Sequence, residues 1–165
     1  MIYTVTMNPA LDKTITVPDL SIDRVNRAAA VRQDPGGKGI NVAKVLTKLG
    51  VPCLAVGFTG GPAGQAVQQV LRLQRVPFEF LEVAGSTQTN LKIVDPVRHT
   101  NTDINEPGFA VTPALLEELL QQLLRRLQPG DLVVLAGSLP QGAPADTYGA
   151  WVRRCREAGA KVFLD

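Results

Sequence analysis

Hydrophobic positions along the chain follow two different spacings, which predicts a protein that alternates strands and helices. Short runs rich in β-branched residues are typical of buried strands. Between these runs, apolar residues recur every three or four positions, which indicates helices with one buried face. The predicted strands cover residues 2–7, 51–59, 77–83, 131–137 and 161–165, and the predicted helices cover residues 35–50, 60–73, 112–128 and 145–158.

The clearest predicted helix is the leucine-rich segment 112–128. Thr112 suits the N-cap, and Pro113 suits the first helical position. A leucine stripe on a single helix of this length is more often core than a coiled-coil seam. The run 131–137 is apolar after its first residue, which is typical of a strand covered on both faces. The alternation of such strands with helices predicts an α/β fold with a mainly parallel sheet.

A second group of predicted strands is polar on one side and does not fit inside a parallel sheet. Residues 13–20, 28–32, 91–94 and 99–104 belong to this group. Within the first of them, Pro18 favours a position near a sheet edge. We therefore expect a separate small β layer that forms a lid over one end of the main sheet.

Bulk composition excludes several classes of protein. The 165 residues fit about one domain, and a formal charge of +2 is too small to favour nucleic acid or an anionic membrane as a partner. Cys53 and Cys155 lie far apart and His99 has no companion, so neither a disulfide scaffold nor a histidine-based metal site is expected. No signal peptide and no membrane-spanning apolar run are visible, which predicts a cytoplasmic protein.

Three short motifs follow predicted strands or open a predicted helix. Gly37, Lys38 and Asn41 lie at a glycine-rich helix start, where backbone N–H groups and a lysine favour anions. The spacing matches neither a Walker A loop nor a dinucleotide fingerprint. Asp12 is expected at the end of the first strand, where it could accept hydrogen bonds from hydroxyl groups, and Ser138 follows the most apolar strand. Ordinary turns would explain each motif equally well on its own.

Taken together and in order, the motifs resemble those of a known family. N-P-A-L-D, G-G-K-G-I-N-V-A, T-D-I-N-E-P-G and G-S-L-P occur along the chain. This combination resembles the 1-phosphofructokinase and tagatose-6-phosphate kinase branch of the PfkB (ribokinase-like) carbohydrate kinases. The resemblance covers residues 1–165.

The resemblance implies a three-layer αβα sandwich with a β-sheet lid. Residues 1–165 would be the N-terminal part of one ribokinase-like domain, with lid strands inserted at about 13–34 and 89–106. Its implied substrate-binding residues are Asp12, Gly37, Lys38, Asn41, Asn90, Lys92 and Ser138. Among them, Lys38 would face the phosphate already on the substrate. Asn105 and Glu106 would lie near the phosphate-transfer region, and the lid would pair two subunits into a homodimer.

Two departures from the family pattern matter. Gln88 replaces an arginine of the family's T-R-x-N-V-K motif, and glutamine supplies no charge for a phosphate. The G-A-G-D motif, whose aspartate is the catalytic base, is absent, and Asp131 in P-G-D belongs to a turn. The chain also stops at Asp165, at the end of a predicted strand, where α/β proteins place their ligand crevice. We therefore expect the N-terminal half of a kinase, with its base and its ATP and Mg²⁺ sites beyond Asp165.

Three functions remain in order of preference. The first is phosphorylation of fructose 1-phosphate to fructose 1,6-bisphosphate with ATP, for which this chain alone would be inactive. The second is the same chemistry on tagatose 6-phosphate or fructose 6-phosphate. The third is a non-catalytic module that binds a sugar phosphate without turning it over.

Overall fold

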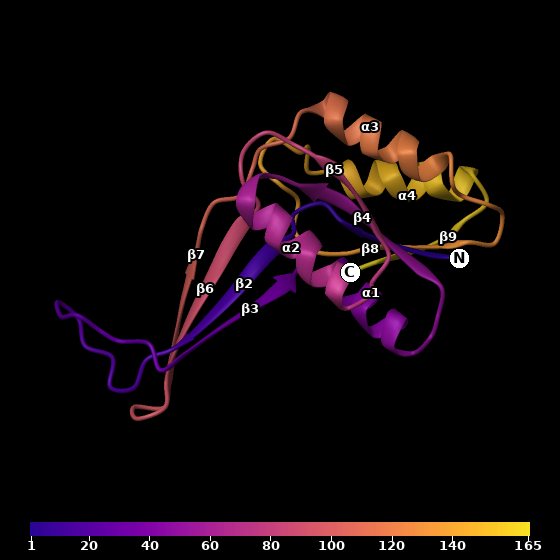
Figure 1. Ribbon diagram of the computed structural model, residues 1–165. Helices are drawn as coiled ribbons and strands as arrows, with labels where there is room; N and C mark the ends of the chain where they lie inside the picture. Colours follow the sequence, from indigo (N-terminus) through magenta and orange to yellow (C-terminus); the bar gives the residue numbers. More distant parts are fainter.

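The computed structural model describes residues 1–165 and shows helices on both faces of a parallel sheet (Figure 1). The five strands have the spatial order β5-β4-β1-β8-β9. They are β1 (Ile2–Thr6), β4 (Cys53–Thr59), β5 (Phe78–Glu82), β8 (Leu132–Leu135) and β9 (Lys161–Leu164). The helices are α1 (Lys38–Lys48), α2 (Gly61–Leu73), α3 (Pro113–Leu124) and α4 (Thr147–Glu157). The predicted α/β class and parallel sheet are confirmed.

Two hydrophobic clusters join the layers. The larger one packs α3 and α4 on one face of the sheet, where leucines of α3 meet Val5, Phe58 and Val133. The smaller one packs α1 and α2 on the other face, over Ala55. The leucine-rich helix is therefore part of the core, and the Thr112 side chain accepts a hydrogen bond from the N–H of Leu115 as the predicted N-cap.

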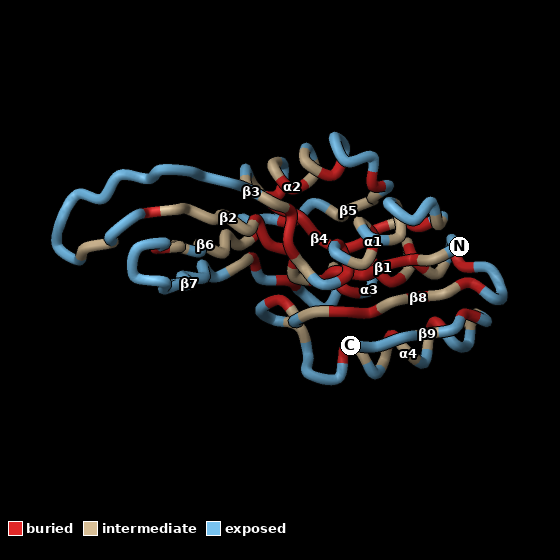
Figure 2. The backbone as a smooth tube through the Cα atoms, turned by 90° about the horizontal axis from the view of Figure 1, so that it is seen from below, coloured by how far each residue is buried: buried red, intermediate tan, exposed pale blue.

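The expectation that β8 is covered on both faces is only half right. Val133 and Leu135 are buried against the larger cluster, whereas Leu132 and Val134 are only half-buried. The reason is that helix α1, on the second face, packs mainly over β1 and β4. The neighbouring edge strand β9 is mostly exposed (Figure 2).

A second sheet of four strands projects from the body of the molecule (Figure 1). In spatial order its strands are β3 (Ala30–Gly36), β2 (Ala10–Thr16), β6 (Gln88–Asp95) and β7 (Thr100–Asn105). The central pair β2 and β6 is parallel, and the two outer pairs are antiparallel. The separate small β layer predicted from the polar alternation is therefore present.

Two details of this sheet correct the sequence expectations. The strand containing Asp12 is not at a sheet edge, because β2 pairs with β3 and β6 on its two sides. Pro18 lies after the last residue of β2 and so removes no hydrogen bond from the ladder. Asp12 is also not at the end of β1, because the chain bends at Met7 and Asn8 and Asp12 is already inside β2.

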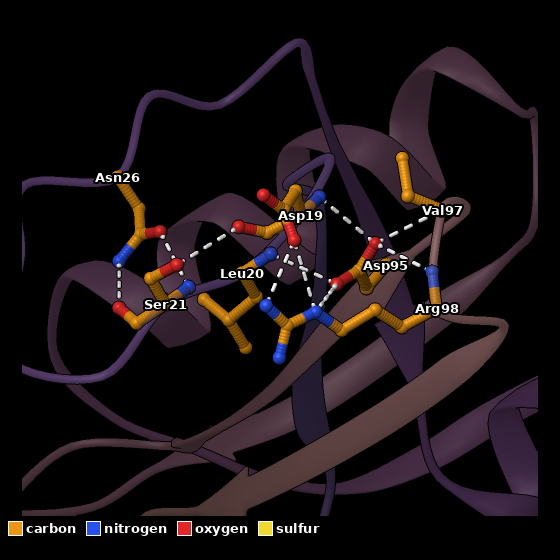
Figure 3. A network of polar contacts seen from close by, with 7 residues as sticks. All are labelled: Asp19, Leu20, Ser21, Asn26, Asp95, Val97 and Arg98. Atoms are coloured by element: carbon orange, nitrogen blue, oxygen red, sulfur yellow. Dashed lines mark hydrogen bonds and ion pairs between the residues drawn. The ribbon is translucent and has the colours of Figure 1, made fainter.

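The far end of the second sheet is fixed by the carboxylate of Asp95, which is only 2% exposed (Figure 3). It accepts hydrogen bonds from the backbone N–H groups of Asp19, Leu20, Val97 and Arg98 at 2.8–3.2 Å. Burial raises the pKa of Asp95, but the four N–H donors together outweigh burial and hold the pKa below its usual range. The guanidinium of Arg98 also contacts Asp19 at 2.8 Å. Asp95 therefore ties the segment after β2 to the turn between β6 and β7.

From this anchor, residues 18–29 run out as an arm whose residues 22–29 are all exposed (Figure 2). Within the arm, the side-chain oxygen of Asn26 accepts from the N–H of Ser21 at 3.0 Å, and its amide donates to the Ser21 carbonyl at 2.8 Å. The arm presents Ile22 and Val25, which are 94% and 87% exposed. Ile22 and Val25 are thus exposed to solvent on a segment whose first residues are fixed by hydrogen bonds to Asp95.

Candidate functional site

A polar cavity of about 650 Å³ is lined by the second sheet and helix α1. Each of the four strands contributes two polar side chains that are two residues apart, because alternate residues of a strand share one face, and Pro35 of β3 also lines the cavity. The strand register arranges these side chains in two cross-strand rows. The first row is Asp34, Asp12, Asn90 and Asn105, and the second row is Arg32, Thr14, Lys92 and Asp103.

The first row is rich in hydrogen-bond acceptors. Asn90 donates from its side-chain amide to a carboxylate oxygen of Asp12 at 3.0 Å, which fixes the orientation of that carboxylate. The carboxylate lies directly over Gly36, where an added Cβ would stand 2.3 Å from Asp12 Oδ2. Glycine at position 36 therefore leaves the space that Asp12 occupies.

The second row carries positive charge that is partly neutralised. Arg32 Nε lies 2.7 Å from Asp34 Oδ2, across the gap between the rows. Lys92 Nζ lies 3.9 Å from Asp103 Oδ1, at the limit of an ion pair. The two rows together offer acceptors and cations to a ligand that is both hydroxylated and anionic.

Helix α1 forms the opposite wall, with Asn41 and Lys44 lining the cavity one turn apart. The helix begins after Gly37, whose φ of 113° is in the region that favours glycine. No side chain caps this end, so its first N–H groups remain available to an anion. The helix can approach β1 because added Cβ atoms at Gly37 and Gly39 would stand 2.6 and 2.5 Å from the side chain of Thr6.

Four of the predicted site residues lie outside the lining of this cavity: Gly37, Lys38, Ser138 and Glu106. Lys38 has a 61% exposed side chain and forms an ion pair with Asp165 at 2.9 Å, at the end of β9. Ser138 follows β8 and accepts a hydrogen bond from the side-chain amide of Asn8 at 3.1 Å. Gly37 supplies the helix start described above. The Lys38–Asp165 and Asn8–Ser138 pairs therefore lie at the carboxyl ends of the sheet strands.

The turn before Ser138 is fixed by Tyr148, whose hydroxyl donates to the Gly137 carbonyl at 3.0 Å. Burial raises the pKa of Tyr148 to about 12, so this hydroxyl remains a neutral donor at physiological pH. Gly137 itself has a φ of 98°, which a side chain would strain. Ser138 is thus held by Asn8, which follows β1, and its preceding residue is held by Tyr148 of α4.

Glu106 and Gln88 also lie beside the cavity rather than in its lining. The Glu106 carboxylate accepts from the N–H of Thr89 at 3.3 Å, and its own N–H donates to the Thr89 carbonyl. Glu106 thus continues the pairing of β7 with β6. The side chain of Gln88 lies against Gly108, since an added Cβ there would stand 3.6 Å from Gln88 Cβ.

The structure therefore brings together five of the predicted residues and adds others that the sequence reasoning missed. Asp12, Asn41, Asn90, Lys92 and Asn105 share the cavity. The charged or polar side chains that were missed are Thr14, Arg32, Asp34, Lys44 and Asp103. The period of two along each strand, and the three-residue step after Asn41, would have pointed to them.

Fold and cavity together define the class: an α/β protein with helices on both faces of a parallel sheet, a projecting second sheet and a polar cavity for a small hydrophilic ligand. The chain belongs to the pfkB family of carbohydrate kinases, whose sequence profile matches residues 5–165.

Individual relatives agree with this assignment. The chain is 39% identical to a 1-phosphofructokinase of Bacillus subtilis, over 100% of this chain and 53% of that protein. It is 33% identical to a tagatose-6-phosphate kinase of Staphylococcus epidermidis, with the same coverage of the two chains. A crystal structure of phosphofructokinase-2 from Escherichia coli in complex with fructose-6-phosphate has a TM-score of 0.90 and 27% identity, and it covers 99% of this chain and 54% of that chain. The chain thus spans about half the length of the curated relatives it matches.

Proposed function

We propose that residues 1–165 are the N-terminal part of one ribokinase-like domain of a sugar-phosphate kinase, with the second sheet acting as its lid. The proposed reaction transfers the γ-phosphoryl group of ATP to the 6-hydroxyl of fructose 1-phosphate and yields fructose 1,6-bisphosphate and ADP. The observation that carries the proposal is the pair of polar rows facing α1, in a chain 39% identical to a 1-phosphofructokinase. Tagatose 6-phosphate and fructose 6-phosphate are the alternative substrates.

In this proposal the cavity binds and orients the sugar. Asp12 accepts hydrogen bonds from sugar hydroxyls, and Asn90 keeps its carboxylate in place. Asn41 and Asn105 complete the hydroxyl contacts, and the lid sheet covers the sugar from water. Lys38, Gly37 and Ser138 lie toward the carboxyl ends of the main-sheet strands, which suits the end of the sugar that receives the phosphoryl group. Glu106 follows β7 of the second sheet, and we assign it to the same end.

The residues of this chain do not form a site for the metal ion that the family implies. No group of three His, Cys, Asp or Glu side chains is placed to hold a metal. The chain also lacks the G-A-G-D motif that carries the proposed base. We therefore assign no step through Mg²⁺ to these residues, and we place the base outside them. No helix has the length and apolar character needed to cross a membrane.

The proposal predicts binding without turnover for the 165-residue chain. Calorimetric titration should show fructose 1-phosphate binding at least about tenfold more tightly than fructose, because a phosphate adds charge-assisted hydrogen bonds. Fructose 6-phosphate and tagatose 6-phosphate, titrated in parallel, rank the alternative substrates. A coupled assay with ATP should detect no product. Equal affinity for fructose and all three sugar phosphates would refute the sugar-phosphate proposal. ATP-dependent turnover would refute the proposal that the catalytic base lies outside residues 1–165.

We also propose that the lid pairs two copies of the protein. The outer lid strands β3 and β7 have free edges, and large apolar side chains are exposed on the arm and the lid. These side chains are Ile22, Val25, Val31, Val97 and Ile104.

The proposed dimer can be tested through Asp95, because the Asp95 carboxylate holds the base of the arm that carries Ile22 and Val25. Sedimentation velocity should show a dimer for the unmodified chain and a weaker dimer for Asp95→Asn, because an amide cannot accept four N–H groups as a carboxylate does. The folded-state pKa of Asp95 is lowered, so its stabilisation is present above the unfolded pKa of about 3.9 and is lost as pH falls through the folded value. The dimer should weaken in the same acidic range. Asp146→Asn, remote from the lid, is the control, and a monomeric unmodified chain would contradict the proposal.

A further inference from the structure

The charged side chains that line the cavity are three carboxylates and three cations, and they are not equivalent. The carboxylates are Asp12, Asp34 and Asp103, and the cations are Arg32, Lys44 and Lys92. A ligand phosphate carries up to two negative charges, so it needs a cation whose charge is not already neutralised.

Two of the three cations already have carboxylate partners. Arg32 pairs with Asp34 at 2.7 Å, and Lys92 faces Asp103 at 3.9 Å. The ammonium of Lys44 instead donates only to the backbone carbonyl of Pro35, at 3.4 Å. No carboxylate oxygen lies within 4.0 Å of it. Lys44 is therefore the cavity cation with uncompensated charge.

The position of Lys44 also suits a fixed contact. Its side chain is half-buried and stems from the second turn of α1, a helix packed on β1 and β4. Partial burial reduces screening of the charge by water, and a helix holds the group more firmly than a loop does. Asn41, one turn earlier, lines the same cavity, so a sugar contacted by Asn41 would bring its substituents within reach of Lys44.

Lys38, which the family resemblance places at the substrate phosphate, is arranged differently. It forms an exposed ion pair with Asp165 at 2.9 Å and does not line the cavity. Six residues along α1 separate Lys38 from Lys44, which is about 9 Å along the helix axis.

We propose that Lys44 is a specificity-determining residue that binds the phosphate already carried by the sugar, whereas Lys38 faces the end that receives the new phosphoryl group. This inference rests on the proposed function. Asp12 and Asn90 then form hydrogen bonds with the sugar hydroxyls between the phosphate-bearing end and the acceptor end. Arg32 and Lys92 lie in the same cavity and add secondary positive charge.

The test compares two ligands on matched variants of the 165-residue chain. The affinities for fructose 1-phosphate and for fructose are measured by ligand-observed NMR titration, and their ratio is the readout. Lys44→Gln should reduce this ratio about 10- to 100-fold while the affinity for fructose stays unchanged, since only the charge-assisted contact to phosphate is lost. Lys44→Arg should retain most of the ratio.

Two other lysines of the same helix serve as controls. Lys48→Gln removes an exposed charge outside the cavity and should leave the ratio unchanged. Lys38→Gln should change the ratio far less than Lys44→Gln. A Lys44→Gln ratio equal to that of the unmodified chain overturns the assignment of Lys44 alone. An unmodified chain that prefers no sugar phosphate over fructose overturns the proposed function and this inference together.

Discussion

Gly57→Ala is expected to lower the free energy of unfolding by about 3 kcal/mol, a large loss for a single methyl group. Gly57 lies in β4, directly opposite Thr6 in the parallel pairing with β1. A Cβ at this position would stand 2.0 Å from the backbone oxygen of Thr6. Both strands are central and paired on both sides, so neither backbone can move away without breaking other hydrogen bonds. Urea unfolding followed by circular dichroism measures the change.

Gly149→Ala is the matched control for that substitution. Gly149 lies within α4, and an added Cβ would meet only Arg153 Nη1, at 3.9 Å. Because alanine favours a helix by about 1 kcal/mol over glycine, this variant should be as stable as the unmodified chain or slightly more stable. If Gly57→Ala unfolds at the same urea concentration as Gly149→Ala, the close approach of β4 to β1 is wrong.

The second large effect is expected at the site: Asp12→Ala should weaken fructose 1-phosphate binding by at least roughly 100-fold. The substitution removes both acceptor oxygens of the first row's central carboxylate and leaves the Asn90 amide without its partner. Hydrogen bonds to a charged group contribute about 1.5–3 kcal/mol each, so loss of two is sufficient for this change. Calorimetric titration of the 165-residue chain measures the affinity.

Stability and charge need separate controls in this experiment. Asp12 lies in the lid sheet, outside both hydrophobic clusters, so the urea midpoint of Asp12→Ala should stay close to that of the unmodified chain. Glu118→Gln removes one negative charge from the exposed face of α3 and should leave binding unchanged. Retained affinity in a folded Asp12→Ala protein would remove Asp12 from the proposed site.

The two variants probe different consequences of the same geometry. Gly57, Gly37 and Gly39 all lie against Thr6, so β4 and the start of α1 both approach this one residue of β1 closely. This close approach places the first turns of α1, and with them Asn41 and Lys44, opposite the lid rows. Packing of these glycines against Thr6 therefore positions α1, which forms one wall of the cavity.

Several features were predictable from the sequence because they depend on local physical chemistry. Apolar periodicity located every helix and the strands of the main sheet to within a few residues. Thr112 was correctly expected to cap α3, since the side-chain hydroxyl satisfies a free N–H at the helix start. The polar alternation of the remaining strands correctly predicted a separate sheet, because a polar face cannot be buried between helices.

Other features were decided only by tertiary structure, because they depend on which strands become neighbours. The cross-strand rows exist because Asp12 pairs with both Asp34 and Asn90, residues separated by 22 and 78 positions along the chain. The sequence pattern placed Asp12 at the end of β1, whereas the fold puts Asp12 inside the second sheet. Lys44 stands out only in the structure. Arg32 pairs with Asp34 of its own strand and Lys92 faces Asp103 across β6 and β7, whereas Lys44 has no carboxylate partner. The local pattern of this sequence thus determined its helices and strands. The long-range strand pairing determined which polar and charged side chains line the cavity together.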